Sequence, residues 1–363
     1  MKVAIYSPYL DTFGGGERYM MTIAEILSVE SSVDILLDQH LQELGADYLK
    51  DTLSKRFNLN LQKATFINAP IGKHSSAVSR ILFLKKYDVF VYLTDGSIFF
   101  PTAKKNILHI QSPLVGEVNS LRRKIKLSGW DLIIYNSKFT EENSKKNWPL
   151  SSQVIYPPVD VEKIKPLKKK RYVLSVGRFF GYLKDKKHEI LIQTFRELFE
   201  TGKINGWSLQ LVGSAGERDT DYLEELQALA KGLPVKFYPN LDYGKLIKLY
   251  GQSSIYWHVA GFEETDPTKM EHFGISTVEA MAAGCVPVVI GKGGQLEIIE
   301  DKISGYLWET LEDLKGFTLE LISNQNLQDK MSKNATRRAQ NFSKSKFEES
   351  ILGVSYLLDS IKD

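Results

Sequence analysis

The sequence has a single cysteine and no long hydrophobic run. Cys285 is alone among 363 residues, which excludes an intrachain disulfide and a cysteine-rich metal site. No apolar stretch approaches the roughly 20 residues that a membrane-spanning helix needs. The apolar run at the N-terminus stops at Pro8 and is too short for the core of a signal peptide. These absences predict a cytoplasmic protein from a reducing compartment.

Excess charge is also absent. The 47 Lys and Arg residues and 44 Asp and Glu residues leave a net charge of +3, so we expect no nucleic-acid partner. Residues 1–168 contain 22 basic and 17 acidic residues, and the remainder contains 25 and 27. The first half of the chain is therefore modestly basic and the second half slightly acidic.

Strand-like and helix-like segments alternate along the chain. The length suggests two domains at about 150 residues each. Short apolar runs between polar or turn residues indicate strands buried on both faces. These runs are Val3–Ser7, Val33–Leu37, Asp88–Leu93, Ile107–Ile110, Leu132–Tyr135, Tyr172–Val176, Leu209–Val212, Val235–Tyr238, Ile255–His258 and Val286–Ile290. Helical patterns lie between them, as at Glu17–Leu27 and Gln42–Phe57. The alternation predicts an α/β protein with parallel sheets covered by helices.

The pattern restarts after a Pro- and Lys-rich stretch at Tyr156–Arg171. We interpret this stretch as an interdomain linker that packs no core. The predicted domains are residues 1–165 and 166–342, both Rossmann-like, followed by an amphipathic helix within 343–363 that packs back toward the first domain. Two such domains with parallel sheets facing across a cleft would bind ligands at the carboxyl ends of their strands.

Each half of the chain has a motif just after its first predicted strand: glycines in the first half and cations in the second. Gly14, Gly15 and Gly16 open the first helix, where backbone N–H groups can approach an anion; a flexible turn is the alternative. The three glycines lack the G-x-G-x-x-G spacing of NAD-binding proteins. In the second half, Arg178 ends the strand, and Lys184, Lys186 and Lys187 precede the next helix. Together these cations could hold a diphosphate; a solvated lysine cluster is the alternative.

The segment Glu271–Gly284 is the most informative. Glu271 and Glu279 are eight residues apart across a junction between a loop and a helix. Ser276 and Glu279 have the spacing of a capping box, which is a structural explanation for Glu279 but not for Glu271. A second glycine loop follows at Gly291–Gly294.

With these motifs the chain resembles the retaining glycosyltransferases of family 4, also called group 1, which have the two-domain GT-B fold. The resemblance is strongest from Tyr172 to Ile299. It rests on the E-x7-E pair Glu271 and Glu279, the strand-Gly-Arg element ending at Arg178, the N-terminal glycine loop and the segment Tyr156–Asp160.

The resemblance implies a role for each matching residue. Arg178 and Lys186 would neutralise the departing diphosphate, and Glu271 would contact the transferred sugar, which makes these three the candidate catalytic residues. The remaining donor contacts would come from Phe273, Gly274, Ile275, Ser276, Glu279, Gly15 and Gly16, with Glu279 on the ribose hydroxyls. The family implies no metal and no cofactor beyond the nucleotide-diphosphate sugar itself, because cations and a helix N-terminus stabilise the negative charge.

The sequence departs from the family where a histidine is often found before a small residue and proline. Gln111 occupies that place, and His109 lies two residues earlier on the same face of the strand. Either side chain could reach a sugar hydroxyl, although a lone histidine on an apolar strand is more often a core residue. Asp219 and Asp221 match a metal-binding D-x-D pattern, but an aspartate before a helix usually caps it.

The sequence therefore predicts a transfer of sugar from a nucleotide-diphosphate sugar to a glycan, lipid-linked or small-molecule acceptor, with retention of configuration and the acceptor in the first domain. Alternatives are another GT-B enzyme, such as a nucleotide-sugar epimerase or phosphorylase, and a non-catalytic bilobal sugar-binding protein. A basic amphipathic helix at Glu117–Trp130 suggests peripheral contact with an anionic membrane. A solvated surface helix is the alternative there.

Overall fold

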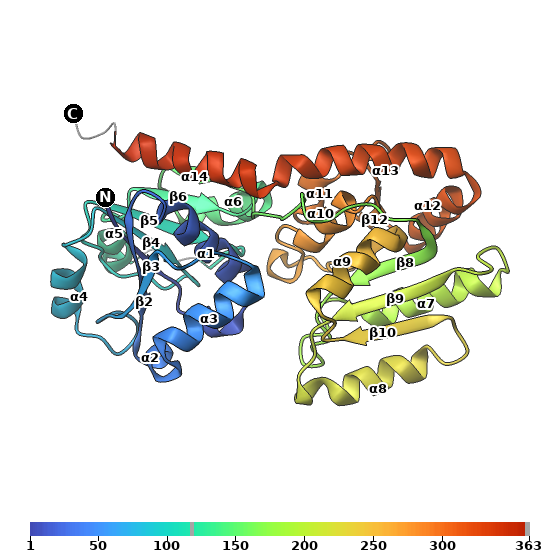
Figure 1. Cartoon of the computed structure of the whole chain (residues 1–363), viewed down its shortest axis with the longest axis horizontal. Helices are drawn as coiled ribbons and strands as arrows, with labels where there is room; N and C mark the ends of the chain where they lie inside the picture. The colour runs from blue at the N-terminus through green and yellow to red at the C-terminus, as the bar shows by residue number, and fades with distance from the viewer. Residues whose placement is uncertain (117–119, 360–363) are drawn as a thin grey trace. The chain divides into compact units, whose positions relative to one another are not determined.

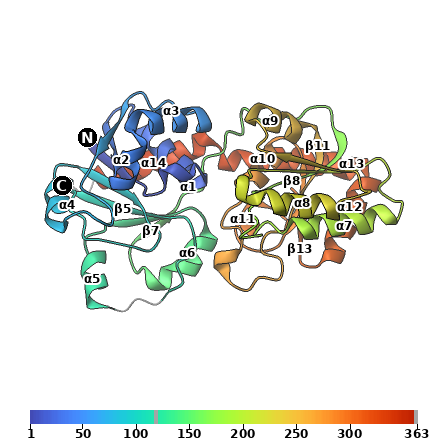
Figure 2. The ribbon, with the colours of Figure 1, turned by 90° about the horizontal axis from the view of Figure 1, so that it is seen from below.

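The computed structural model describes the backbone of residues 1–116 and 120–359, and the side chains of these residues up to Val354. The chain forms two compact units. One comprises Met1–Pro158 and Ser345–Asp363, and the other Val159–Lys344. The sequence places these boundaries at 165/166 and 342/343. Each unit contains one parallel sheet with helices against it (Figures 1 and 2).

The first unit is built on a seven-stranded sheet of order β3-β2-β1-β4-β5-β6-β7, parallel throughout. Its strands are β1 (Lys2–Tyr6), β2 (Ser32–Leu37), β3 (Ala64–Asn68), β4 (Val89–Leu93), β5 (Lys105–Ile110), β6 (Leu132–Tyr135) and β7 (Ser152–Val154). Its helices are α1 (Gly15–Leu27), α2 (Gln39–Leu44), α3 (Ala46–Phe57), α4 (Ala77–Leu84), α5 (Leu121–Leu127), α6 (Lys138–Ser144) and most of α14 (Lys344–Asp359).

Alternating side chains of these strands form two apolar layers. Val3 and Ile5 pack with α1, α3 and α14 on one face, and Ala4 and Tyr6 join the layer beneath α4 and α5 on the other. Both faces are covered, so the strands are apolar at nearly every position, as expected for a parallel sheet.

The second unit has a six-stranded parallel sheet of order β10-β9-β8-β11-β12-β13. Its strands are β8 (Lys170–Val176), β9 (Ser208–Gly213), β10 (Val235–Pro239), β11 (Ser253–His258), β12 (Val286–Ile290) and β13 (Tyr306–Trp308). Its helices are α7 (His188–Glu200), α8 (Thr220–Leu229), α9 (Tyr243–Gln252), α10 (Ile275–Ala282), α11 (Gln295–Ile298), α12 (Leu311–Ser323) and α13 (Gln325–Ala339). In both sheets the first strand lies between the second and fourth, which confirms the predicted pair of Rossmann-like α/β domains.

Three details differ from the sequence prediction. The helix expected at Gln42–Phe57 is two helices, because Gly45 adopts a positive φ of 88° and ends α2. The strands β3, β7 and β13 were not predicted; β7 is only three residues long and half-buried throughout. The predicted linker does pack a core, since Val159, Val161 and Ile164 are at most 2% exposed.

The last helix, α14, packs as expected against the first unit. Phe347, Ile351 and Val354 are buried in the same apolar cluster as α1 and β4. No helix within residues 1–116 and 120–359 combines the length and the apolar character needed to cross a bilayer.

Candidate active site

In the second unit, the strand order reverses between β8 and β11. The two strands are neighbours, while the chain leaves them toward opposite ends of the sheet. Open α/β sheets bind ligands just beyond the carboxyl ends of such a strand pair. Arg178 follows β8, and His258 is the last residue of β11.

A carboxylate between two basic side chains lies at this point. The Lys186 Nζ donates a hydrogen bond to Glu271 Oε2 at 2.7 Å, and the His258 Nε2 lies 3.0 Å from the same oxygen. The side chains of Lys186 and Glu271 are 19% and 20% exposed. Burial alone would raise the pKa of Glu271, but Lys186 and His258 outweigh it and hold that pKa well below its ordinary value of 4.5. Glu271 is therefore a carboxylate that reaches solvent through a small opening.

Glycines bring the chain close enough to assemble this cluster. A Cβ on Gly177 would lie 2.8 Å from Lys186 Cγ, so the lysine stem crosses the backbone where only glycine leaves room. A Cβ on Gly293 would overlap the Glu271 carbonyl oxygen, and the Gly294 N–H donates to that oxygen at 2.8 Å. The predicted second glycine loop thus fixes the backbone of Glu271.

Helix α10 begins beside the cluster. Gly274, at φ 118°, is its N-cap, and no side chain caps it. The capping box predicted from Ser276 and Glu279 is wrong, because Ser276 lies inside the first turn and its Oγ accepts a hydrogen bond from Tyr256 at 2.8 Å. The first-turn N–H groups of Ile275 and Ser276 thus lie at an uncapped terminus that suits an anion.

Glu279 lies one turn further along α10. It is 6% exposed and accepts a hydrogen bond from the Tyr250 hydroxyl at 3.1 Å. Phe273, just before the helix, is 3% exposed and packs on Phe342. Phe273 therefore supports the loop from within the core.

Arg178 is the most accessible predicted cation. Its side chain is 51% exposed, pairs with Asp185 at 3.3 Å and lies over the ring of Phe180. The neighbouring lysines are paired elsewhere: Lys184 with Glu225 at 3.0 Å, and Lys187 with Glu264 at 2.9 Å. Asp185 also lies 3.9 Å from Lys186 Nζ, so the two predicted diphosphate cations share one carboxylate.

Sequence reasoning missed His258, because no other ligand-type residue lies at a suitable spacing from it in the sequence. The signal that could have found His258 is its position at the carboxyl end of the predicted strand Ile255–His258. In a Rossmann-like sheet this fourth strand lies beside the first, where ligands bind.

In the first unit, the glycine loop is shaped by Glu17. Its carboxylate accepts hydrogen bonds from the Gly14 N–H at 2.7 Å and from the Thr12 hydroxyl at 2.8 Å. The side chain of Gln111, just after β5, lies against Gly16, where a Cβ would overlap it. The structure therefore brings Gly15, Gly16 and Gln111 together at one edge of the first sheet.

His109, the other candidate for a sugar contact, is a core residue. It is fully buried, stacks on Tyr19 at a centroid distance of 3.9 Å, and bonds through Nδ1 to the Ile134 carbonyl oxygen at 3.0 Å. Burial lowers the pKa of His109 to about 4, so the ring is neutral at pH 7. Of the two candidates, only Gln111 is accessible to a sugar.

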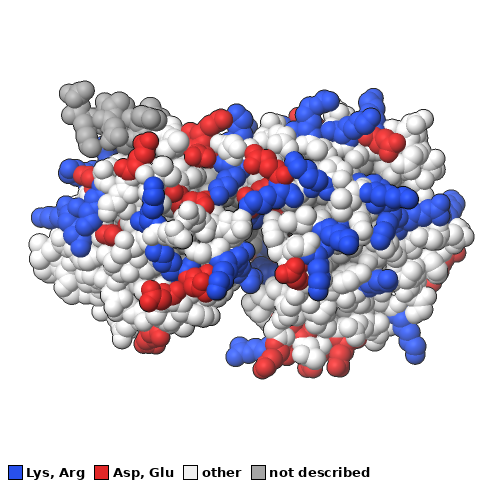
Figure 3. Space-filling model, viewed as in Figure 1, with Lys and Arg blue, Asp and Glu red and all other residues white. Residues whose placement is uncertain are grey.

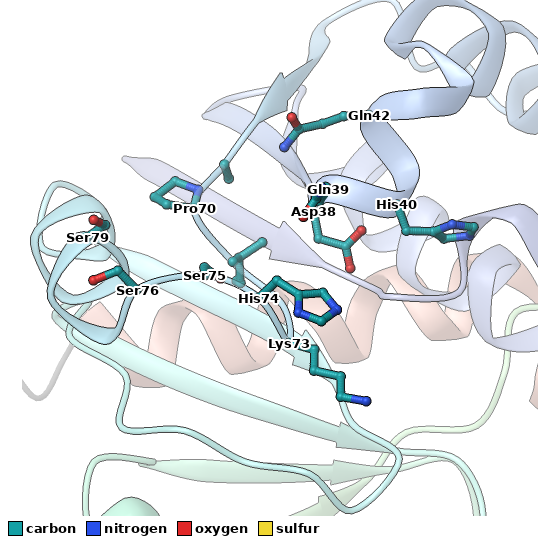
Figure 4. Close-up of a pocket in the computed structure, with 12 residues that line it drawn as sticks. Asp38, Gln39, His40, Gln42, Pro70, Lys73, His74, Ser75, Ser76 and Ser79 are labelled. Carbon is teal, nitrogen blue, oxygen red and sulfur yellow. The ribbon is translucent and has the colours of Figure 1, made fainter.

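A pocket of about 360 Å³ lies beyond the carboxyl ends of β2 and β3 (Figure 4). Ser76 and Ser79, at the start of α4, line one side, and Asp38 and His40 line the other. Asp38 is held by the Tyr6 hydroxyl at 2.8 Å and the Leu41 N–H at 3.1 Å. Lys73 and His74 lie between the two sides. The lining offers hydroxyl, imidazole and ammonium groups that suit a polyhydroxylated ligand.

The predicted amphipathic helix is shorter than Glu117–Trp130. Helix α5 spans only Leu121–Leu127, with Ser120 as its N-cap, and residues 117–119 lie outside the described part of the chain. Trp130 is 3% exposed and donates to the Phe99 carbonyl oxygen, so the expected interfacial tryptophan is a core residue. Leu121 and Ile125 remain 75% and 55% exposed.

The D-x-D pattern has a structural role. Asp219 is 4% exposed and accepts hydrogen bonds from the N–H groups of Gly181 at 3.0 Å and Gly216 at 2.8 Å. Across residues 1–116 and 120–359 no group of three or more His, Cys, Asp or Glu residues is placed to hold a metal ion.

Comparison with known families decides the identity of this arrangement. Residues 159–338 match the family described as glycosyl transferases group 1. This range contains Arg178, Lys186, His258, Glu271 and Glu279. Residues 159–338 belong to the group 1 glycosyl transferases. The predicted family is thereby confirmed.

Among the relatives of this chain are proteins named GDP-Man:Man(3)GlcNAc(2)-PP-Dol alpha-1,2-mannosyltransferase. The protein from Dictyostelium discoideum is 27% identical over 272 residues, covering 70% of this chain and 51% of its own. The one from Mus musculus is 30% identical over 246 residues, covering 61% and 47%. The chain thus spans about half the length of these relatives.

Solved structures confirm the GT-B fold. A glycosyltransferase from Rickettsia africae has a TM-score of 0.75 at 18% identity and covers 100% of this chain and 99% of its own. The Anabaena protein HepE in complex with UDP has a TM-score of 0.72 at 18% identity, covering 98% and 100%.

Proposed function

We propose that this protein transfers a hexosyl group from a nucleoside-diphosphate sugar to a lipid-linked glycan, with retention of the anomeric configuration. The observation that supports it best is the Lys186–Glu271–His258 cluster beside the uncapped start of α10, at the reversal point of the second sheet. The relatives named as mannosyltransferases acting on a dolichol-linked glycan favour mannose and a lipid-linked acceptor.

Each group at the site has a part in this reaction. Arg178, Lys186 and the N–H groups of Ile275 and Ser276 would bind the diphosphate and stabilise its charge as it leaves. Because Arg178 and Lys186 both lie near Asp185, phosphate oxygens would replace that carboxylate as their partner. No metal is needed for this charge balance in the proposal.

Glu271 would face the transferred sugar. Its depressed pKa keeps it ionised at neutral pH, so it accepts hydrogen bonds and does not protonate a leaving group. For retention, the diphosphate leaves and the acceptor attacks the sugar from the same face. A phosphate oxygen of the donor would take the acceptor's proton, and no protein base is assigned. Glu279, whose carboxylate is held by Tyr250, would accept hydrogen bonds from ribose hydroxyls.

The acceptor would use the first unit. Gln111 against Gly16 and the pocket between Asp38 and Ser79 supply polar groups for a glycan at the carboxyl edge of that sheet. Helix α5 would reach the lipid surface through Leu121 and Ile125, with Arg122, Lys124 and Lys126 exposed beside them. The protein would then work in the cytoplasm at a membrane surface.

A donor panel tests the proposed activity. Nucleotide release from GDP-mannose, UDP-glucose, UDP-galactose and UDP-N-acetylglucosamine is measured with and without a lipid-linked glycan. Acceptor-dependent release of one nucleotide, with an α-linked product, supports the proposal. Tight donor binding with no transfer would indicate a binding protein, and release of free epimerised sugar would indicate an epimerase.

Vesicle sedimentation tests the membrane part separately. We expect the wild-type chain to sediment with anionic vesicles and a variant with Arg122, Lys124 and Lys126 changed to Gln to remain in solution. Equal sedimentation of the two chains would refute the role of α5.

A further inference from the structure

The second unit has a basic pocket at the edge of its sheet opposite the candidate active site. The pocket holds about 440 Å³ and lies where β8, β9 and β11 begin, whereas Arg178 and His258 lie where strands end. Its volume is within the usual range of small-molecule sites. Its lining comprises Lys169, Lys170, Arg171, Lys203, Asn205, Trp207, Ser254, Ile322, Gln325 and Gln328.

Four of these side chains are cations and none is an acid. Lys170, Arg171 and Lys203 are exposed, and within the described part of the chain no carboxylate pairs with them. The Lys170 Nζ lies 5.4 Å from the ring of Tyr172, and an Arg171 guanidinium nitrogen lies 3.5 Å from the Asn205 carbonyl oxygen. Their charges are therefore not balanced within the protein.

This imbalance is not the general state of the molecule. Residues 169–363 contain more acidic than basic residues, 27 against 25, and other cations of the unit, such as Lys187 and Lys315, pair with carboxylates. Basic and acidic side chains are interspersed over the face shown in Figure 3. Three unpaired cations around one pocket are thus a local exception.

The floor and rim of the pocket are firmly built. The Nζ of the half-buried Lys169 donates to the carbonyl oxygens of Ser253 and Ala283, both at 2.7 Å, and burial lowers the pKa of this lysine. Gln325 and Gln328 come from the first turn of α13, a helix of 15 residues whose positive end therefore faces the same space. Asp329 accepts a hydrogen bond from Gln325 at 2.8 Å and does not line the pocket.

We propose that this pocket binds a phosphate-bearing ligand, separate from the nucleotide-sugar site. Three side-chain cations provide charge-assisted donors that match the several oxygens of a phosphate group. The dipole of α13 adds positive potential, although Asn324 already accepts a hydrogen bond from the Leu327 N–H of its first turn. Arg171 can bind two of these oxygens at once, and Lys170 and Lys203 add point charges. The phosphate belongs either to a soluble ester or to a lipid headgroup, since both present the same oxygens to the pocket.

Equilibrium dialysis of the full chain with radiolabelled inorganic pyrophosphate tests the proposal. A parallel measurement with Arg178→Ala accounts for any probe taken up by the nucleotide site, because added GDP or UDP would itself present phosphate groups to the pocket. The pocket variant combines Lys170→Gln, Arg171→Gln and Lys203→Gln, while Lys169 is kept because its bonds are structural. The matched control combines Lys231→Gln, Lys236→Gln and Lys245→Gln, which removes the same charge from exposed positions of the same unit.

We expect the pocket variant to bind pyrophosphate at least tenfold more weakly than the wild type, and the control variant to match the wild type. If the two variants lose affinity equally, only bulk charge matters and the proposal is overturned. Circular dichroism of both variants verifies that they are folded, which is expected because all six side chains are exposed.

A second arm identifies the source of the phosphate. Vesicles of phosphatidylcholine with and without phosphatidic acid are sedimented with the wild-type pocket and with both variants. All three chains also carry Arg122, Lys124 and Lys126 changed to Gln, so that α5 does not contribute to the binding. Selective loss of phosphatidic-acid binding in the pocket variant assigns the pocket to a lipid headgroup, and dialysis binding without vesicle binding assigns it to a soluble ester. An unchanged pocket variant in both arms refutes the site.

Discussion

The ion pair between Lys186 and Glu271 should stabilise the second unit as well as serve the donor. Glu271→Gln removes the charge but keeps the size. Among the described residues, Asp185 at 3.9 Å is then the one carboxylate that pairs with the Lys186 ammonium, which is 19% exposed. Exposed pairs contribute about 0–1 kcal/mol and the loss of one partner from a buried pair costs about 3–5 kcal/mol. For a pair of intermediate exposure we expect a cost of about 2 kcal/mol at pH 7.

The cost should disappear in acid. The pKa of Glu271 is lowered in the folded chain, so the stabilisation is complete above the ordinary value of 4.5 and is lost as the pH falls from there through the folded-state pKa. Hydrogen exchange of the amides in β11 and α10 measures the local opening free energy in both chains. The difference between wild type and Glu271→Gln should be largest at neutral pH and shrink below pH 4.5.

A double-mutant cycle with Lys186→Met isolates the pair. We expect a coupling of about 1–2 kcal/mol at pH 7, because the two residues are in direct contact. A coupling below about 0.3 kcal/mol, or a Glu271→Gln cost that does not change with pH, would refute the electrostatic explanation.

Three further outcomes are expected. In steady-state assays, Arg178→Ala and Lys186→Ala should each lower kcat about 10²–10³-fold. Lys184→Ala should change kcat by no more than about twofold, because the Lys184 ammonium pairs with Glu225. Equal losses in all three variants would show that the placement of the cations is unimportant. Gly213→Ala should destabilise the unit by about 1–3 kcal/mol in thermal unfolding, because its Cβ would overlap the Gly177 carbonyl oxygen, while Gly316→Ala, in open space on α12, should be stabilising. A chelator should leave the transfer rate unchanged, and a loss that a divalent ion restores would contradict the metal-free proposal.

The sequence was sufficient for the α/β class and the family because those depend on local signals. Buried parallel strands are apolar at every position, so they are visible as short runs, and the two glutamates around Gly274 form a recognisable spacing. Strands such as β7, half-buried at each of its three residues, give no such signal. The break at Gly45 was also missed, because a single glycine inside a helical pattern is often tolerated.

Contacts between distant segments could not be predicted. His258 contacts Glu271 because the loop before α10 passes the end of β11. No repeated spacing in the sequence links these two residues. The supposed cap at Ser276 failed because Gly274, with its positive φ, begins the helix two residues earlier. The burial of Val159 and Ile164 was hidden by the prolines and lysines around them.

The path of the chain between the two units sets the order in which they can be completed during synthesis. The second unit is continuous from Val159 to Lys344, but the first also needs Phe347, Ile351 and Val354, which seal the apolar layer over β4 and β5. A ribosome therefore finishes the second unit's sequence while the first still has an open apolar face. Nascent chains usually fold from their N-terminal domain onward. Here the N-terminal unit cannot complete its apolar layer until the last helix of the chain has been synthesised.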